Sequence, residues 1–372
     1  MCMIPLSTLI QLALNERASD IHLRCDEKPI FRIDGVIRIL EESIFSEEDI
    51  QKCAEILIPE RLKPVLKVSK EVDFAYEPEI EGQKLRMRVN VFTAQGKLGI
   101  AMRIINDHAF QLDTLGFPDF VLAKVKELLG RTRGLFLVTG PTGSGKSTTL
   151  AAMIDYINQH HNRHIITIED PIEFIYQRRH SIITQRELGK DTPSFQKALA
   201  GALRQDPDVI LLGEMRDLAT IEAAVSAAET GHLVLSTLHT TGSVRTVDRI
   251  VDAFPEGSKE LVRTQLASNL MGVVSQVLCR HSSGTGRLAA FEVMLHSDAV
   301  ATLIRENKTF RLQTEIETGQ QLGMLPLDKH LFQLWQEQKI SEEEALSKAL
   351  LPKEMKLHMG DSPIKKKGLF SF

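Results

Sequence analysis

Residues 140–147 read GPTGSGKS, between the apolar run GLFLVT (134–139) and the segment TTLAAMIDYI. The pattern G-x-x-x-x-G-K-[ST] between a strand and a helix is typical of a loop that binds the phosphates of a nucleoside triphosphate. Its glycines let successive N–H groups point into one concavity, and the following helix adds its positive end. We expect the nucleotide to be bound by Gly140, Pro141, Thr142, Gly143, Ser144, Gly145, Lys146, Ser147 and Thr148. Lys146 would reach the β- and γ-phosphates, and the Ser147 hydroxyl would be a ligand of Mg²⁺.

Hydrolysis also requires a group that aims water at the γ-phosphate. The segment PDVILLGEMRD (207–217) is an apolar strand that ends in Glu214, which we expect to orient or deprotonate that water. An ordinary strand of this kind carries Asp before the Glu, whereas this chain has Gly213. Ser147 is then the main protein ligand of Mg²⁺, and water fills other positions, as this ion commonly allows. The alternative is a strand-end carboxylate that caps a neighbouring helix.

A second acidic group follows the predicted strand HIITI (164–168), in the sequence ITIEDPIEF. It comprises Glu169, Asp170 and Glu173, and Pro171 forces the chain to turn directly after the strand. We expect these three carboxylates at the carboxyl edge of the sheet, where ligands bind in open α/β folds. A solvated turn is the alternative interpretation.

Two histidines flank the predicted strand 232–237 in AAETGHLVLSTLHTT. The odd spacing of His232 and His239 places them on opposite faces, so they are poor joint ligands for one metal ion. We expect each to form its own hydrogen bond, with the γ-phosphate, Glu214 or a neighbouring subunit; a purely structural role is the alternative. The cluster HHNRH (160–164) is interpreted as solvated surface.

The pattern along the chain predicts two domains. Residues 1–105 read as an α+β domain with an antiparallel sheet, with helices at 5–18 and 46–58 and a hairpin turn at Asp34-Gly35. After a linker (106–120), strands alternate with helices over 121–295, as in a parallel α/β sheet. These strands are predicted at 134–139, 164–168, 208–212 and 232–237, with a further pair near 287–295. Helices follow over 296–350, and 351–372 reads as a flexible tail.

The composition excludes several classes of protein. Among 372 residues, 45 Lys and Arg stand against 49 Asp and Glu, for a net charge of −4. This balance does not support a dedicated nucleic-acid binder. Four scattered cysteines without a CxxC pair indicate neither a disulfide framework nor a zinc site. The N-terminal segment has no signal-peptide pattern, and no apolar run has the length of a membrane span, so we expect a soluble cytoplasmic protein.

With these motifs in order, the chain resembles the secretion and type IV pilus ATPases, specifically the pilus-retraction (twitching motility) branch. In that family ITIEDPIE is the Asp box, LLGEMRD the atypical Walker B strand and AETGHLVLSTLHT the His box, all behind the Walker A loop. The resemblance covers roughly residues 5–345. It implies a RecA-like P-loop ATPase core preceded by a PAS-like domain, with C-terminal helices.

The resemblance also implies an assembly and partners. It implies a homo-hexamer in which arginines of the PAS-like domain reach the active site, and the matching residues here are Arg88 and Arg103. The implied cofactors are ATP and Mg²⁺. The implied partners are an inner-membrane platform protein of the pilus and a paralogous pilus ATPase, which would hold this cytoplasmic protein at the inner face of the membrane.

Two alternatives to a principal retraction motor stay open, and two others are disfavoured. The assembly and type II secretion enzymes of the family carry a four-cysteine zinc insertion after the His box, whereas here that region has only Cys279. Retraction motors have an AIRNLIR-type helix, but residues 299–305 read AVATLIR, with Ala301 in place of Arg. An accessory retraction ATPase is therefore one alternative, and a nucleotide-gated adaptor without turnover is another. A DNA-translocating motor is disfavoured, since no basic stripe or aromatic stacking run is found.

Overall fold

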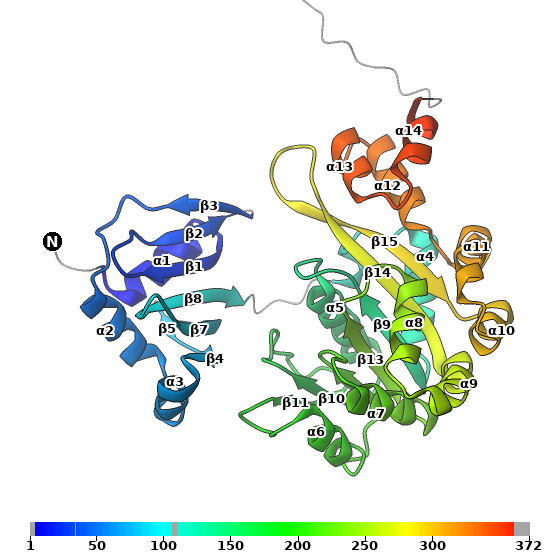
Figure 1. Ribbon diagram of the computed structural model, residues 1–372, viewed down its shortest axis with the longest axis horizontal. Coiled ribbons are helices and arrows are strands. Elements are labelled where there is room, and N and C mark those ends of the chain that lie inside the picture. Colours follow the sequence, from blue (N-terminus) through cyan, green and yellow to red (C-terminus); the bar gives the residue numbers. More distant parts are fainter. Residues whose placement is uncertain (1–3, 34, 106–110, 361–372) are drawn as a thin grey trace, which may run out of the picture. The chain divides into compact units, whose positions relative to one another are not determined.

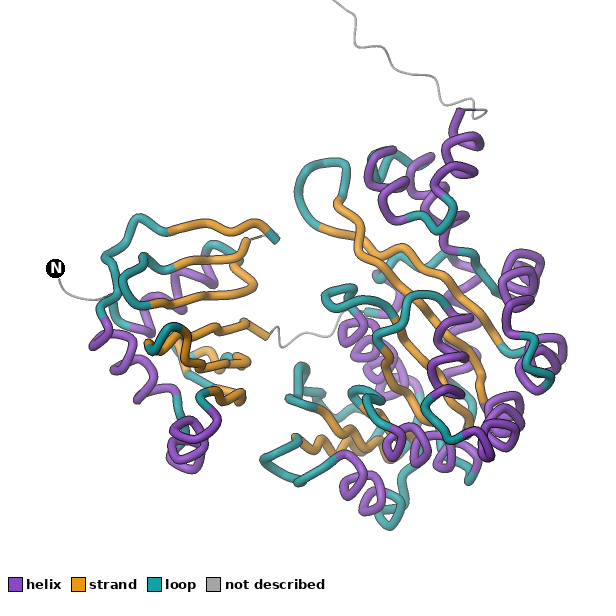
Figure 2. The backbone as a smooth tube through the Cα atoms, in the orientation of Figure 1, coloured by secondary structure: helices purple, strands orange, loops and turns teal. Residues whose placement is uncertain are grey.

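The computed structural model describes residues 4–33, 35–105 and 111–360. The chain forms two compact units: Met1–His108 with Pro171–Ile175, and Ala109–Asp170 with Tyr176–Phe372 (Figure 1). The strands of each unit lie side by side with helices beside them (Figure 2). Each unit thus has a sheet of its own.

The first unit is built on a six-stranded antiparallel sheet in the order β3-β2-β1-β8-β7-β4. Its strands are β1 (Ala18–Arg24), β2 (Ile30–Ile33), β3 (Val36–Ile39), β4 (Glu71–Tyr76), β7 (Arg86–Ala94) and β8 (Lys97–Ile105), with a separate short pair, β5 (Glu79–Ile80) and β6 (Gln83–Lys84). Its helices are α1 (Leu6–Asn15), α2 (Glu47–Leu57) and α3 (Lys63–Ser69). The antiparallel sheet agrees with the sequence pattern. The expected turn at Asp34-Gly35 includes Asp34, which lies outside the described residues.

Local sequence signals account for these elements. In α1, the buried residues Leu6, Leu9, Ile10 and Ala13 follow the 3.6-residue period of one helix face. Helix α2 begins with a capping box, in which the Ser46 side chain accepts from the Asp49 N–H and the Asp49 side chain accepts in return. The helix expected over 5–18 ends at Asn15, because β1 begins at Ala18.

The second unit contains a seven-stranded sheet in the order β11-β10-β12-β13-β9-β14-β15. Neighbouring strands are parallel from β11 to β14, and only β15 runs antiparallel, against β14. The strands are β9 (Gly134–Thr139), β10 (His164–Glu169), β11 (Ile182–Glu187), β12 (Val209–Leu212), β13 (Leu233–Leu238), β14 (Leu270–Arg280) and β15 (Arg287–Leu295). The expected parallel α/β class is confirmed.

Helices cover this sheet and continue to its C-terminal side. They are α4 (Asp119–Leu129), α5 (Lys146–His160), α6 (Phe195–Ala202), α7 (Leu218–Glu229), α8 (Ser243–Asp252), α9 (Lys259–Asn269), α10 (Asp298–Arg305), α11 (Leu312–Thr318), α12 (Leu327–Gln336), α13 (Glu342–Lys348) and α14 (Pro352–Gly360). Helices α6, α7, α8 and α9 pack on one another in one layer (Figure 1). Helix α5 connects β9 to β10 and so runs along the sheet in the direction opposite to the connections that contain α6, α7, α8 and α9. Because parallel crossovers are right-handed, α5 lies on the opposite face of the sheet.

The structure differs from the sequence expectations in three segments. Strand β11 was not expected, because Ile182–Glu187 carries a mostly polar, half-buried sequence at the sheet edge. Strand β14 was not separately predicted, although it is almost entirely buried. Helix α14 occupies 352–360, within the expected flexible tail; its Met355 and Met359 are buried against α12 and α13. Residues 361–372 of that tail lie outside the described residues. Among the described helices, none has the length and apolarity needed to cross a bilayer.

A glycine lets β12 end close to β10. The Gly213 N–H donates to the Ile168 carbonyl at 2.8 Å. A Cβ at this position would lie 3.3 Å from the same oxygen and 3.4 Å from the Glu169 Cα. Both neighbours are backbone atoms of a buried strand, so they cannot rotate away. The close packing at this position favours glycine, and an aspartate would crowd the end of β10.

We predict that Gly213→Ala lowers stability through this crowding, by about 1–3 kcal/mol. Thermal unfolding should register a midpoint lower by roughly 2–4 °C for each kcal/mol in a domain of this size. Gly257→Ala is the matched control, since a Cβ there meets no atom within 4 Å. Equal midpoints for the two variants would contradict the packing argument.

Candidate functional site

The loop after β9 has the geometry of a phosphate-binding loop. Strand β9 is buried throughout, and the chain leaves it at Gly140 with a positive φ. Gly143 and Gly145 also have positive φ, of 77° and 89°, which L side chains rarely adopt. No side chain caps the first turn of α5, whose N-cap is Gly145. The helix therefore presents backbone N–H groups and its positive end to whatever lies in the loop.

Lys146 and Ser147 occupy the first turn of α5. Lys146 is 8% exposed, and its Nζ donates to the carbonyl oxygens of Gly140 and Pro141, at 3.0 Å each. Its ammonium group therefore lies over the loop itself. Ser147 is half-buried, whereas Pro141, Thr142 and Gly143 are exposed at the mouth of the loop. The loop and the first turn of α5 thus contain one cation, the hydroxyl side chains of Thr142, Ser144, Ser147 and Thr148, and several backbone amides.

Glu214 lies at the same edge of the sheet. It follows β12, and β13 lies between β12 and β9, so the ends of β9 and β12 are about 10 Å apart. The backbone around Glu214 is anchored to β13: the Met215 N–H donates to the Thr237 carbonyl at 3.0 Å, and the Thr237 hydroxyl donates to the Gly213 carbonyl at 2.7 Å. The carboxylate of Glu214 is 13% exposed.

Two side chains contact the Glu214 carboxylate. His239 Nε2 lies 3.4 Å from its Oε2, and Arg216 forms an ion pair with its Oε1. A second nitrogen of Arg216 lies 3.9 Å from the Asp170 carboxylate, so this arginine lies between two predicted acidic residues. Sequence reasoning missed Arg216; its position two residues after Glu214 in GEMRD was the only available signal.

Glu169 is the last residue of β10, next to β12, and Asp170 follows it. Glu169 is buried, and its Oε1 accepts from the Thr167 hydroxyl at 2.7 Å and from Gln185 Nε2 at 3.4 Å. Asp170 is partly exposed beside Arg216. The structure thus brings Glu169, Asp170, Glu214 and His239 to one edge of the sheet, together with the loop after β9.

The loop that follows His239 is held by two residues of the β14–β15 pair. The Gly242 N–H donates to Ser275 Oγ at 2.9 Å, and the Ser243 N–H donates to Glu292 Oε1 at 2.7 Å. Burial raises the pKa of the Glu292 carboxyl, which the backbone hydrogen bond from Ser243 opposes. Ser275 and Glu292 are direct cross-strand partners, so one point of the sheet holds the start of α8.

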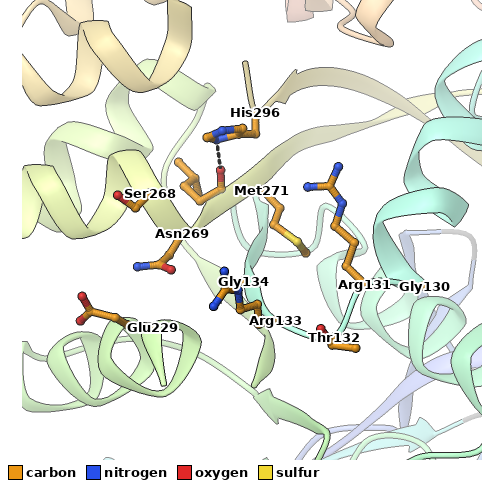
Figure 3. A pocket seen from close by; sticks show the side chains of 11 residues that line it. Gly130, Arg131, Thr132, Arg133, Gly134, Glu229, Ser268, Asn269, Met271 and His296 are labelled. Carbon is orange, nitrogen blue, oxygen red and sulfur yellow. Dashed lines mark hydrogen bonds between the residues drawn. The ribbon is translucent and has the colours of Figure 1, made fainter. Parts of the chain in front are cut away.

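His232 lies away from these residues. It precedes β13, at the opposite edge of the sheet, and its Nδ1 lies 3.0 Å from the Ala227 carbonyl. The chain does not bring it together with Glu214. This edge also contains a cavity of about 660 Å³, whose lining includes Arg131, Arg133 and His296 (Figure 3). Since residues 130–134 come just before β9, the cavity is distinct from the loop after that strand.

Arg88 and Arg103 belong to the first unit and face each other across neighbouring strands, β7 and β8. Like charges in direct cross-strand positions destabilise a sheet unless they are compensated. Asp20 on β1 accepts from Arg103 Nε at 2.8 Å, and Asp73 on β4 accepts from Arg88 Nε at 3.0 Å. Arg103 is still 64% exposed. The structure therefore brings the two predicted arginines together on one face of the sheet.

The residues after β9 fit the phosphates of a nucleotide. The uncapped helix, three positive-φ glycines and Lys146 supply donors and positive charge in one concave loop. Within 4–33, 35–105 and 111–360, no three His, Cys, Asp or Glu side chains gather so as to hold a metal ion by themselves. Hydroxyl side chains, that of Ser147 among them, lie in the loop and at the start of α5.

Comparisons with known proteins place the chain in a family. The model of the family "Type II/IV secretion system protein" matches residues 2–329. The chain is 42% identical over 347 residues to the type IV pilus retraction ATPase PilT of Pseudomonas aeruginosa, covering 93% of this chain and 98% of that protein. It is 45% identical over 322 residues to a twitching motility protein of Neisseria gonorrhoeae, covering 86% and 84%.

A solved structure extends the likeness to three dimensions. A crystal structure of the pilus retraction motor PilT with bound ADP superposes with a TM-score of 0.84 at 42% identity, covering 95% of this chain and all of that one. Sequence and fold thus agree over nearly the whole length. The chain belongs to the type II/IV secretion system protein family, among the relatives of the type IV pilus retraction ATPases.

Proposed function

We propose that this chain is a ring-forming, Mg²⁺-dependent ATPase that drives the retraction of type IV pili. The observation that carries the proposal is the common sheet edge, where the loop holding Lys146 and Ser147 lies two strands from Glu214. Such an edge combines a phosphate-binding loop with a carboxylate that can act on water. A simple nucleotide-binding adaptor does not require the second feature.

The residues divide the chemistry between them. Lys146 and the N-terminal amides of α5 bind the β- and γ-phosphates. Bound Mg²⁺, with the Ser147 hydroxyl as protein ligand and water in other positions, would neutralise charge on the phosphate oxygens. Glu214 orients the attacking water and accepts its proton. His239 and Arg216, which contact its carboxylate, hold Glu214 in place, and Glu169 and Asp170 add negative charge beside it.

In the proposed homo-hexamer, arginines of the first unit supply further positive charge to the phosphates. The exposed Arg103 and its cross-strand partner Arg88 form a like-charged pair on one face of the first unit. A planar guanidinium suits a phosphate group better than an ammonium does. We infer that these arginines act on a nucleotide in a homo-hexamer, so that domain movement around the ring accompanies each turnover.

The relatives indicate what the energy of ATP hydrolysis is used for. PilT of Pseudomonas aeruginosa is a pilus retraction ATPase, and the Neisseria relative is a twitching motility protein. We propose the same role here, at the cytoplasmic face of the membrane, with a pilus platform protein as the binding partner. His232, at the opposite sheet edge, would act only through a neighbouring subunit.

An accessory retraction ATPase is the second candidate. Ala301, which replaces the arginine of the AIRNLIR-type helix, lies in α10 and is 7% exposed within the core. In this chain that position contributes to packing rather than presenting a charge. The alternative is decided by complementation of a retraction-deficient strain: a principal motor restores retraction alone, and an accessory ATPase restores it only beside a partner motor. The inactive Glu214→Gln protein serves as control.

We predict that Lys146→Ala weakens ATP binding by ~10–100-fold, because it removes a charge-assisted contact with the phosphates. Calorimetry on the full-length chain measures this directly. Lys124→Ala is the control: this partly exposed lysine of α4 pairs with Glu127 of the same helix, and its loss should leave affinity unchanged. Unaltered affinity in Lys146→Ala would overturn the phosphate-loop assignment.

Glu214→Gln should separate binding from chemistry. The amide retains the size of the side chain but cannot accept a proton, so we expect normal ATP affinity with hydrolysis slowed by ~10²–10⁴-fold. Phosphate release measures the rate. Glu229→Gln, at the opposite edge of the sheet, makes the same chemical change at an exposed carboxylate and should retain full activity. If turnover in Glu214→Gln stayed near normal, the base would have to be Glu169 or Asp170.

Mixed rings test the proposed role of Arg103. Glu214→Gln and Arg103→Ala subunits should each be inactive alone, the second because arginine fingers contribute ~10³–10⁵ in rate. Their mixture should regain partial ATPase activity, since an intact Glu214 can meet an intact Arg103 from a neighbour. Arg24→Ala, on an adjacent strand of the same sheet, should keep its activity throughout. Inactive mixtures in demonstrably mixed rings would exclude action between subunits.

A further inference from the structure

A buried glutamine lies directly behind the phosphate-binding loop. Gln276 is on β14, the strand that runs beside β9, and Ser275 pairs with Thr139, the last residue of β9. Gln276 therefore adjoins Gly140, where the loop begins. Its side chain is 1% exposed and lies far from Gly140–Thr149 in the sequence, so no local motif indicates the contact.

Both polar atoms of this side chain are hydrogen bonded to the loop and its helix. Gln276 Nε2 donates to the Ser144 carbonyl at 2.6 Å. Its Oε1 accepts from the Thr149 hydroxyl at 2.8 Å. Because a carbonyl can only accept, the amide can serve both partners in one orientation alone. One side chain thus joins the tip of the loop to the first turns of α5.

Gln276 also lies so close to two glycines of the loop that it leaves little room for a side chain there. A Cβ at Gly140 would lie 2.3 Å from the backbone carbonyl oxygen of Gln276, and a Cβ at Gly145 would lie 3.1 Å from the Gln276 side-chain Nε2. The loop in its observed conformation therefore packs closely against β14. The glycines allow this close approach, and the glutamine hydrogen bonds hold the loop there.

From this geometry we propose that Gln276 is a positioning residue that keeps the phosphate-binding loop in its nucleotide-binding shape. The inference rests on the nucleotide-binding role proposed above. Gln276 does not itself face the phosphates; it acts through the Ser144 carbonyl and the Thr149 hydroxyl. Its loss lowers the fraction of molecules with a competent loop, and apparent affinity falls by that fraction. ATP and ADP are affected alike, since both place phosphates in the loop.

The test is Gln276→Met in the full-length chain, which keeps the length of the side chain but removes both hydrogen bonds. We expect the Kd for ATP and ADP and the KM for ATP to rise about tenfold. The kcat at saturating ATP should change less than about threefold, because bound phosphates restore the loop. Thr149→Val, which removes one of the two bonds, should raise Kd about threefold, while Thr149→Ser retains the hydroxyl and should restore wild-type affinity.

Asn158→Leu is the matched control. Asn158 is also fully buried, and its amide donates to the Gln177 carbonyl at 2.8 Å and accepts from the Arg179 N–H at 3.1 Å. It lies in the same helix as Thr149, twelve residues after Lys146, or about 18 Å along the axis. The control removes two comparable buried hydrogen bonds, so thermal stability should fall in both variants, but nucleotide affinity only in Gln276→Met.

Three outcomes would overturn the proposal: unchanged Kd and KM in a folded Gln276→Met, an equal loss of affinity in Asn158→Leu, or no difference between Thr149→Val and Thr149→Ser. The last comparison decides the matter if Gln276→Met does not fold. Wild-type protein and Lys146→Ala are measured alongside. If the wild-type chain bound neither nucleotide, the proposed function would fail first, and that result is distinct from a failure of Gln276.

Discussion

Parallel strand pairing is the constraint on which the second unit depends. Strands β10, β12, β13 and β9 are neighbours that run in the same direction, so all of them end at one edge of the sheet. Their residues are almost entirely buried, and reactive side chains can therefore appear only after the strands end. Lys146, Glu214 and His239 follow this rule, and Glu169 is the last residue of its strand, β10. Residues from four separate segments converge without any of them being adjacent in sequence.

Charge organises the first unit in a different way. Arg32 and Arg103 are both register partners of Asp20, and Arg103 in turn faces Arg88. A row of three arginines across a sheet would be repulsive without the carboxylates of Asp20 and Asp73. The ion pairs fix the guanidinium groups, and the exposure of Arg103 leaves it able to contact another anion. That exposure is what the proposed contact of Arg103 with a phosphate requires.

The sequence predicted the elements with strong local signals. Strand β9 was predicted with its observed bounds, because an apolar run before a glycine-rich loop has few other interpretations. The helix predicted at 46–58 is observed as α2, and the capping box of Ser46 and Asp49 accounts for its start. Strand β14 was missed because its pattern, buried on both faces, lacks the alternation that indicates a strand. The contacts of Arg216, Glu292 and Gln276 depend on which strands become neighbours in the sheet. No local sequence pattern indicates an order such as β13-β9-β14, so these contacts could not be predicted.

That strand order also determines which parts of the site can move together. Ser275 and Gln276 are consecutive residues of β14, so their side chains lie on opposite faces of the sheet. Ser275 holds the loop after His239, while Gln276 holds the loop after β9. Strand β14 pairs along its length with β15, which ends at Leu295, three residues before α10 begins. A shift of β14 would therefore alter both loops at once, and it would be transmitted directly to the strand that leads into the C-terminal helices.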